Sequence, residues 1–546
     1  MDATAVRKQE IFAKAVDYIA RSYNAQPPAL IVGLDGRPLA PSGGYAYRKA
    51  AAKRTGSMKN WIPTRYYGPN EESRERRQIV ERSIDLINSD PNAAGIADTY
   101  ATTVVGAGLT PHPLLDSEAL GLSKDETRII QKRQLSIYHV WQSQADASQR
   151  LNFGAIQYLL VHNMIQYGEY LMLLPMLADP SRKYSLACQI INPLRLATPT
   201  DLATRSDIID GVEVGSYGEP VAYWIQKSAR ELGRGTFSAL AVTSKDYLRV
   251  PAKTGHRWNV LHGFAARDAE QYRGTPMFAP AMKFFRDLND YLDAELVSNI
   301  VTAAYSIFIE VGTGTNPIFP ADMALSLSGN KPDTTNQVRY QELIPGQIMY
   351  GNQGEKPIPI FAARPGATFE PFTKVIKKAI SMAINIPYAV LFKDPEATNF
   401  AGFRSAMLDA WRVFMTKRVW LGHDCRKVWT MLQEEAYLRG DIQLKDYYTN
   451  EALLTRTEWR GAPKGDIEPI KANQADVLLV QNNLKTRTAA AAERGDDWRA
   501  IVDQLAEEQE MLIERGLGEK PLNNPPLSYP DKTLDETGEE NELSSS

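Results

Sequence analysis

Three aspartates recur at intervals of three residues in the segment 271–296, QYRGTPMFAPAMKFFRDLNDYLDAEL. Carboxylates can hold a divalent metal, so Asp287, Asp290 and Asp293 could in principle form a site for metal-assisted hydrolysis of nucleic acid. The same spacing places them along one side of a helix next to cationic residues, which is typical of a solvated helical face. We therefore expect no enzyme site here, and a metal-dependent DNA-processing enzyme remains the alternative.

Other motifs that carry chemistry are weak. VVGAGLTP, residues 104–111, has the first two glycines of a dinucleotide-binding loop, but Pro111 occupies the third position and no strand–helix context follows. The six histidines are not paired at metal-ligand spacing, and a P-loop lysine motif, HExxH, CxxC and GxSxG are all missing from the sequence. The sequence therefore predicts no catalytic residue, no metal site and no cofactor.

Composition describes an ordinary folding chain. Its 546 residues are 43% hydrophobic and 23% charged, with a net charge of −3 and two cysteines, so a disulfide framework is excluded and a reducing compartment fits. The sequence has no long uncharged apolar run, and its first residues lack the apolar core of a signal peptide. We expect a soluble protein that is made inside the cell and does not contact a membrane.

Local charge departs from this average at both ends. Residues 1–59 are expected to form a basic arm. The segment from Gly36 to Asn70 has seven basic residues, no acidic one, and interleaved glycine and proline. Such an arm can lie along phosphate or an acidic protein surface, although a solvated linker is an equal alternative. The candidate contact residues are Arg48, Lys49, Lys53, Arg54, Lys59 and Arg65. Residues 519–546 are acidic and polar, which predicts a disordered tail.

The periodicity of the chain predicts a mixed α+β fold. Helices are expected at 71–105 with an Asp-Pro break, at 125–178 with a change to a strand near Glu169, at 277–304, 372–386 and 402–438, and again within 471–516. Short strands are expected between Gln189 and Val260.

The helix predicted at 277–304 is too long for a small domain. Its apolar residues recur every three or four positions and form one apolar stripe, namely Phe284, Phe285, Leu288, Leu292, Leu296 and Ile300. A helix of this length spans about 40 Å. Only one comparable helix follows in the chain, so copies of the same helix are attractive partners, and a ring of copies would bury the stripes between neighbours.

Segments along residues 60–515 resemble the lambda-type portal proteins of tailed bacteriophages. The resemblance is carried by SIDLINSDPNAAGIADTYATTVVGAGLTP (83–111), IINPLRLATPTD (190–201), IIDGVEVGSYGEPVAYWI (208–225), the 271–296 segment, LIPGQI (343–348), MAINIPYAVLFKD (382–394) and NFAGFRSAMLDAWR (399–412). The last departs from the family pattern N-Y-S-S-x-R, because Phe400, Ala401 and Gly402 stand between Asn399 and the arginine. A head–tail connector or vertex ring protein of another lineage is the alternative.

The resemblance implies the portal fold, assembled as a closed homo-oligomeric ring, usually of twelve copies, with a central channel. Its parts would be a wing at 60–275, a first stem helix at 276–305, a clip at 306–371, a second stem helix at 372–391, a tunnel loop at 392–401, a long helix that returns to the wing at 402–470 and a crown at 471–518. The ring would sit at one vertex of the virion capsid, after synthesis in the cytoplasm of the host bacterium.

The resemblance also implies partners and candidate site residues. Double-stranded DNA would pass through the channel without sequence readout, and terminase large subunit, a head–tail adaptor, and the major capsid and scaffolding proteins would bind the ring. The tunnel-loop candidates are Lys393, Asp394, Glu396, Asn399, Phe400 and Arg404. The channel-lining candidates on the stem are Asp287, Asp290, Asp293, Lys374, Lys377 and Lys378. For the three lysines, the alternative is an outward, solvated face of the helix.

Overall fold

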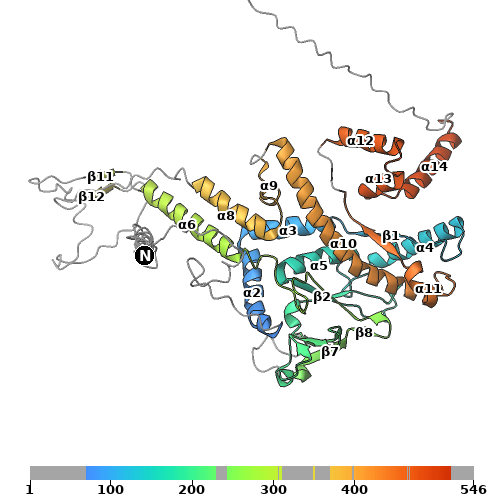
Figure 1. Ribbon diagram of the computed structural model, residues 1–546, viewed down its shortest axis with the longest axis horizontal. Coiled ribbons are helices and arrows are strands. Elements are labelled where there is room, and N and C mark those ends of the chain that lie inside the picture. The colour runs from blue at the N-terminus through green and yellow to red at the C-terminus, as the bar shows by residue number, and fades with distance from the viewer. Residues whose placement is uncertain are drawn as a thin grey trace, which may run out of the picture. The chain divides into compact units, whose positions relative to one another are not determined.

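The computed structural model describes residues 69–228, 243–304, 307–309, 348–350, 369–395, 399–463, 465 and 468–517. The chain divides into Met1–Tyr67 and Gly68–Ser546, and the fold described below belongs to the second unit (Figure 1). The candidate residues of the basic arm, most of the expected clip and the acidic tail lie outside the described residues.

The first two helices meet at the expected Asp-Pro break. α2 covers Pro69–Ser89 and α3 covers Pro91–Val105. Asp90 caps α3, because its carboxylate accepts hydrogen bonds from the backbone N–H groups of Asn92 and Ala93. Pro91 then occupies the first helical turn, where its missing N–H costs nothing.

The next segment changes from helix to strand where the sequence indicated. α4 covers Lys124–Gln142, α5 covers Phe153–Tyr167, and β2 covers Glu169–Leu173. Gly168 ends α5 at φ +86°, a left-handed conformation that glycine adopts without strain. The expectation of continuous helix from 125 was wrong at 143–152, because the Asp146 carboxylate accepts backbone hydrogen bonds from Ser148, Arg150 and Leu151 and stabilises a turn.

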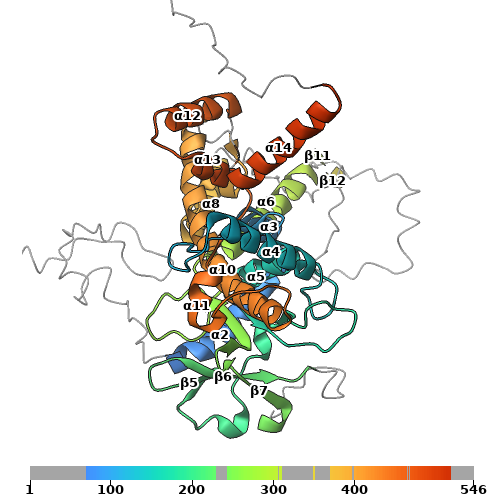
Figure 2. The same ribbon diagram turned by 90° about the vertical axis from the view of Figure 1, so that its right-hand side faces the viewer.

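Short antiparallel strands form two main sheets. One has the order β10-β2-β3 and the other the order β4-β5-β6-β7, of which β5, β6 and β7 lie side by side in Figure 2. The strands are β3 (Gln189–Ile191), β4 (Ile208–Ile209), β5 (Val212–Val214), β6 (Pro220–Gln226), β7 (Tyr247–Pro251) and β10 (Val260–Phe264). A hairpin joins β5 to β6, and Gly215 N–H donates to the Glu219 carbonyl at 2.8 Å.

Three further strand pairs are short. β1 (Thr110–Pro113) pairs with β13 (Thr457–Arg460), and β8 (Lys253–Thr254) pairs with β9 (Arg257–Trp258), both antiparallel. β11 (Ile307–Ile309) and β12 (Ile348–Tyr350) pair in parallel.

The long central helix, α6, covers Met282–Ala304 and begins five residues later than predicted. Pro276 and Pro280 explain the difference. A helix from Met277 would need an N–H at residue 280 to donate to the carbonyl of residue 276, and proline has none. The chain instead makes turns there, with Ala281 N–H donating to Phe278 O at 2.8 Å.

The remaining described elements are helical. α8 covers Phe369–Ile384, α9 Tyr388–Leu391, α10 Phe400–Leu438, α11 Tyr447–Leu454, α12 Pro469–Gln481, α13 Arg487–Glu493 and α14 Trp498–Glu514. The last three confirm the helical prediction for 471–516. Within the described ranges, every helix is too short or too polar to cross a membrane.

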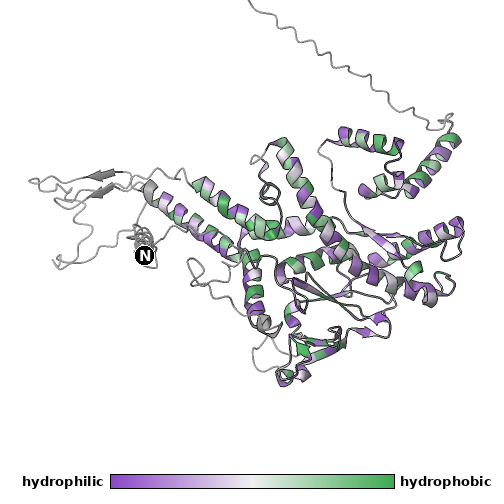
Figure 3. Ribbon diagram, viewed as in Figure 1, coloured by the Kyte–Doolittle hydropathy of each residue, from purple (hydrophilic) through white to green (hydrophobic). Residues whose placement is uncertain are grey.

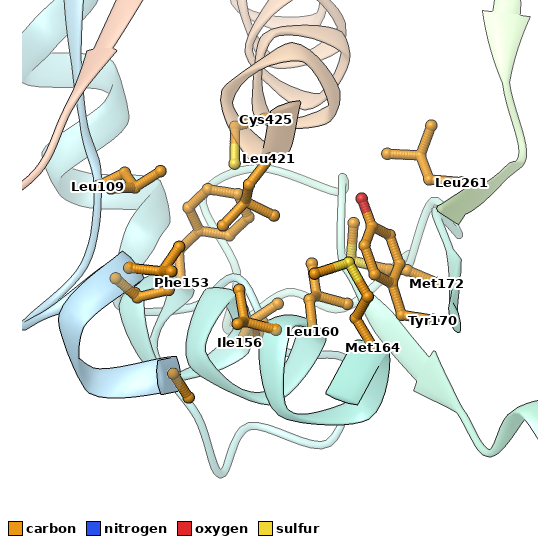
Figure 4. Close-up of a cluster of buried hydrophobic side chains, with 14 of the residues drawn as sticks. Leu109, Phe153, Ile156, Leu160, Met164, Tyr170, Met172, Leu261, Leu421 and Cys425 are labelled. Carbon is orange, nitrogen blue, oxygen red and sulfur yellow. The ribbon is translucent and has the colours of Figure 1, made fainter. Parts of the chain in front are cut away.

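The core surrounds α5. Figure 4 shows Phe153, Ile156, Leu160 and Met164 of α5 beside Leu421 and Cys425 of α10 and beside Tyr170, Met172 and Leu261 of the β10-β2-β3 sheet. Each fully buried side chain of this size contributes about 1.5–3 kcal/mol relative to exposure.

The glycines of the weak dinucleotide motif serve this packing. Gly106 adopts φ +63° at the end of α3. Gly108 adopts φ +127°, and a Cβ there would lie 2.9 Å from Gly154 Cα at the start of α5. The two glycines are therefore required by the positive φ at the end of α3 and by a close backbone approach.

Candidate functional site

The candidate site is the helical region formed by α6, α8, α9 and the beginning of α10. α6 and α8 lie side by side (Figure 1), and the Tyr291 ring of α6 stacks on Phe369 with centroids 5.7 Å apart. Tyr291 also contacts the Phe372 ring edge-on at 5.0 Å. Aromatic contacts therefore join the middle of α6 to the beginning of α8.

Among the described residues, the apolar stripe of α6 is covered at Phe285 and Leu288, near the beginning of the helix, while Phe284 is 39% exposed. Phe285 and Leu288 are fully buried, whereas Leu292, Leu296 and Ile300 are 37%, 60% and 50% exposed. Hydrophobic and hydrophilic residues alternate around α6 in Figure 3. The described part of one copy thus leaves the second half of the stripe exposed, which is costly unless another surface covers it.

The three aspartates of α6 are exposed, as a solvated face requires. Asp290 forms an ion pair with Arg286 one turn away, with an Nε–Oδ1 distance of 3.1 Å. Asp287 and Asp293 are also exposed. Among residues with described positions, His, Cys, Asp and Glu side chains do not gather in groups of three that could hold a metal ion.

Two lysines of α8 lie near aromatic rings, that of Tyr388 in α9 and that of Phe392 directly after α9. Lys374 Nζ is 5.9 Å from the centroid of the Tyr388 ring, and Lys377 Nζ is 5.6 Å from that of Phe392. Lys378 is exposed. A cation over a ring face is stabilised by about 0.5–1 kcal/mol at exposed sites. The structure thus places two of the predicted lysines near α9. The sequence had not singled out the rings of Tyr388 and Phe392 that these lysines contact.

The residues after α9 have a specific conformation. Lys393 adopts φ +54° and is exposed. Asp394 N–H donates to the Ala389 carbonyl at 3.0 Å, and the Tyr388 hydroxyl donates to Asp394 Oδ2 at 2.8 Å. Burial and this hydrogen bond raise the pKa of Tyr388 to about 12. The two adjacent charged side chains therefore have different environments. Lys393 is exposed to solvent, whereas the Asp394 carboxylate accepts a hydrogen bond from Tyr388.

α10 begins at Phe400, two residues before the start predicted from the sequence. Asn399 caps it, with Oδ1 accepting from Gly402 N–H at 2.8 Å, and Phe400 is exposed. Arg404 forms an ion pair with Glu468, with an Nη1–Oε2 distance of 3.6 Å. Glu468, the carboxylate that pairs with Arg404, lies just before α12. Glu396 is outside the described residues.

A buried charge cluster, consisting of Arg76, Glu169, Asp210, His262 and Arg273, lies where the strands meet the segment leading to α6. Glu169 Oε1 is 2.6 Å from Arg273 Nη2, and Glu169 Oε2 is 3.0 Å from His262 Nε2. Arg76 Nη2 is 2.7 Å from Asp210 Oδ2. Two features of the sequence could have indicated this cluster. Glu169 is the single acid in an apolar run, and Arg273 begins the Arg-Gly-Thr-Pro turn.

Charge pairing outweighs desolvation in this cluster. Burial alone would raise the pKa of Glu169, but the charge of Arg273, the His262 hydrogen bond and Arg76 hold it well below its usual range. Gly274 N–H also donates to Glu169 at 2.9 Å. The cluster thus fixes the turn that begins the path into α6 against β2.

The sequence is similar to portal proteins of phages. The family described as phage portal protein, lambda family, matches residues 54–418. The portal protein of Escherichia phage N15 is 20% identical over 459 residues, covering 78% of this chain and 83% of that protein. Portal protein B of Escherichia phage lambda is 20% identical over 522 residues, covering 88% and 93%. A probable portal protein of Halomonas phage phiHAP-1 is 22% identical over 415 residues, covering 73% and 74%.

Two solved structures are also similar. A chain in the neck of a native gene transfer agent particle has a TM-score of 0.40 and 13% identity, covering 80% of this chain and 96% of that chain. A chain in the neck of an empty particle of the same kind has a TM-score of 0.43 and 13% identity, covering 81% and 94%.

Proposed function

The chain belongs to the lambda family of phage portal proteins, and we propose that its copies close into a ring around a channel for double-stranded DNA. The observation that carries this proposal is the uncovered second half of the α6 stripe. Leu292, Leu296 and Ile300 remain exposed in one copy although they continue the line of the buried Phe285 and Leu288. A neighbouring copy offers the same elements at the same height, and ring symmetry lets every copy be covered in turn.

We assign the parts of the ring to the described elements. The strands and helices before Met282 form the wing, α6 and α8 form the stem, and β11 and β12 belong to the clip between them. The segment from residue 392 to Asn399 forms the tunnel loop, two residues shorter than the 392–401 expected because α10 begins at Phe400. α10 returns to the wing, and α12 to α14 form the crown. The first stem helix is shorter than the 276–305 expected, because its first turn follows Pro280.

The charges of the stem suit a channel that DNA slides through. In a ring, each exposed aspartate of α6 repeats once per copy and becomes a band of negative charge. Such a band repels phosphates within a Debye length of about 8 Å and so disfavours adhesion of the duplex to the wall. The cations at α8 and α9 add weak phosphate contacts that carry no sequence information.

The partners follow from the position of such a ring. We propose twelve copies at one vertex of the virion capsid, assembled in the host cytoplasm together with major capsid and scaffolding proteins. The clip binds the terminase large subunit during packaging and a head–tail adaptor afterwards. ATP hydrolysis then belongs to the terminase, and the chain acts as a conduit without a catalytic residue, metal or cofactor of its own.

Sedimentation velocity of two matched variants tests ring closure. Leu296→Glu places a charge in the exposed half of the stripe, and burying it unpaired costs several kcal/mol per copy, so rings should dissociate. Ala294→Glu introduces the same side chain two residues away, on the opposite side of α6, where Ala294 is exposed. This control should assemble like the wild type. A wild-type chain that stays monomeric at micromolar concentration, or equal assembly of both variants, contradicts the proposal.

A further inference from the structure

We infer that the hydrogen bond from Tyr388 to Asp394 determines the charge that the segment after α9 presents to DNA, which makes Tyr388 and Asp394 positioning residues for phosphate contact. The inference rests on the proposed function and concerns one detail of it. Lys393 and Asp394 are neighbours of opposite charge. Unless the carboxylate is held elsewhere, the two side chains can neutralise each other and leave little attraction for phosphate.

The geometry keeps the two charges apart. The Tyr388 hydroxyl donates to Asp394 Oδ2 at 2.8 Å, and the Asp394 backbone N–H donates to Ala389 O at 3.0 Å, so both parts of Asp394 are bound to α9. Lys393 adopts φ +54°, a conformation that lysine rarely takes. Its side chain is exposed while that of Asp394 is half-buried. A backbone conformation of this cost persists only where neighbouring contacts maintain it.

Two further lysines contact aromatic rings in and directly after α9. Tyr388 and Phe392 lie with ring centroids 5.5 Å apart, and Lys374 and Lys377 of α8 lie over these rings. Lys374 and Lys377 thus lie near rings at the two ends of α9, and Lys393 follows α9 in the chain. The negative group closest to Lys393 in the chain is the paired Asp394. Lys393 is exposed, and Lys374 and Lys377 are half-buried. The chemical class that fits such ammonium groups, repeated around a ring, is the phosphate backbone of a duplex, read without regard to sequence.

Three variants separate positioning from a merely structural role. Tyr388→Phe keeps the ring and removes the hydroxyl, so the carboxylate is released next to Lys393. Asp394→Asn removes the charge but can still accept from the Tyr388 hydroxyl. The double variant lacks both the hydroxyl and the charge. If the released negative charge is what weakens phosphate contact, the double variant should regain that contact. A packing defect caused by the missing hydroxyl would persist in the double variant.

The first measurement uses the full chain and the rate at which a neutral acylating reagent modifies Lys393, followed by peptide mass spectrometry. A free carboxylate nearby favours the unreactive ammonium form, so Tyr388→Phe should lower the rate roughly twofold or more. Asp394→Asn and the double variant should react at least as fast as the wild type. An unchanged rate in Tyr388→Phe, or a lowered rate that persists in the double variant, overturns the inference whether or not the chain binds DNA.

The second measurement is binding of a short fluorescent DNA duplex to the assembled full-length protein at low salt. Tyr388→Phe should weaken binding roughly fivefold, the difference should shrink as salt rises, and the double variant should bind like Asp394→Asn. Equal binding by the wild type and Tyr388→Phe contradicts the inference alone. Failure of the wild-type ring to bind any duplex contradicts both the DNA contact and the wider proposal, while the acylation rates still report on the hydrogen bond.

Discussion

The Arg273 guanidinium donates to the Glu169 carboxylate with an Nη2–Oε1 distance of 2.6 Å, and both side chains are buried. This contact joins β2 to the turn that precedes α6, across 104 residues of sequence. Arg273 also donates to the carbonyls of Leu196 and Pro193 at 2.9 and 3.2 Å. The base of the proposed stem is therefore positioned by charge pairing as well as by apolar packing.

Glu169→Gln should destabilise the fold strongly. Removing one partner leaves Arg273 buried without its main counter-charge, which typically costs about 3–5 kcal/mol. Because the folded pKa of Glu169 is depressed, its contribution is present above the unfolded carboxyl value of about 4.3 and is lost as pH falls through the folded value. Denaturant unfolding at neutral and acidic pH measures both effects.

An exposed ion pair provides the control for that experiment. Asp290→Asn breaks the pair with Arg286 on the surface of α6 and should change stability by no more than about 0.5 kcal/mol. Similar losses in the two variants would contradict a special role for the buried charge cluster.

The protection of the β8–β9 hairpin tip against hydrogen exchange should depend on pH. His256 Nε2 lies 2.5 Å from Glu434 Oε1 of α10, and the hydrogen bond and charge of Glu434 raise the pKa of His256. The contact is therefore fully present below about pH 6.5 and is lost as pH rises through the raised value. Hydrogen exchange of residues 253–258, corrected for intrinsic rates, should show less protection at high pH. His256→Gln should remove this pH dependence; a dependence that survives in the variant would assign it to another group.

Lys393→Glu should leave ring assembly intact and reduce retention of packaged DNA, since a band of cations becomes repulsive to phosphate. Asparagine tolerates the left-handed backbone of this position, so Lys393→Asn removes the charge without adding backbone strain and should have an intermediate effect. Retention is measured as the fraction of filled heads after centrifugation. Normal retention in Lys393→Glu would exclude contact between this residue and DNA.

Arg404→Ala should perturb assembly through the crown. The Arg404–Glu468 pair joins the beginning of α10 to the residue before α12, and both side chains are partly exposed, so its effect on unfolding should be below about 1 kcal/mol. We expect a wider distribution of oligomers by mass photometry, and Glu468→Gln should reproduce it. If only one of the two variants alters assembly, the ion pair is not the cause.

Local signals in the sequence predicted most elements, and long-range contacts were not predicted. The Asp90–Pro91 break and the change from helix to strand at Gly168 each depend on a few adjacent residues. The buried charge cluster depends on the meeting of α2, β2, β10 and two turns, for which the sequence has no periodic signal. The Tyr388–Asp394 hydrogen bond was also missed, because it requires Lys393 to adopt a left-handed conformation that lysine rarely takes.

A three-dimensional reconstruction of the purified full-length protein by electron microscopy tests the central proposal most directly. The account predicts a closed ring in which α6 and α8 surround the axis, neighbouring copies cover Leu296 and Ile300, and residues 392–395 face the channel. A population of monomers, or a ring that carries residues 392–395 on its outer surface, would contradict it.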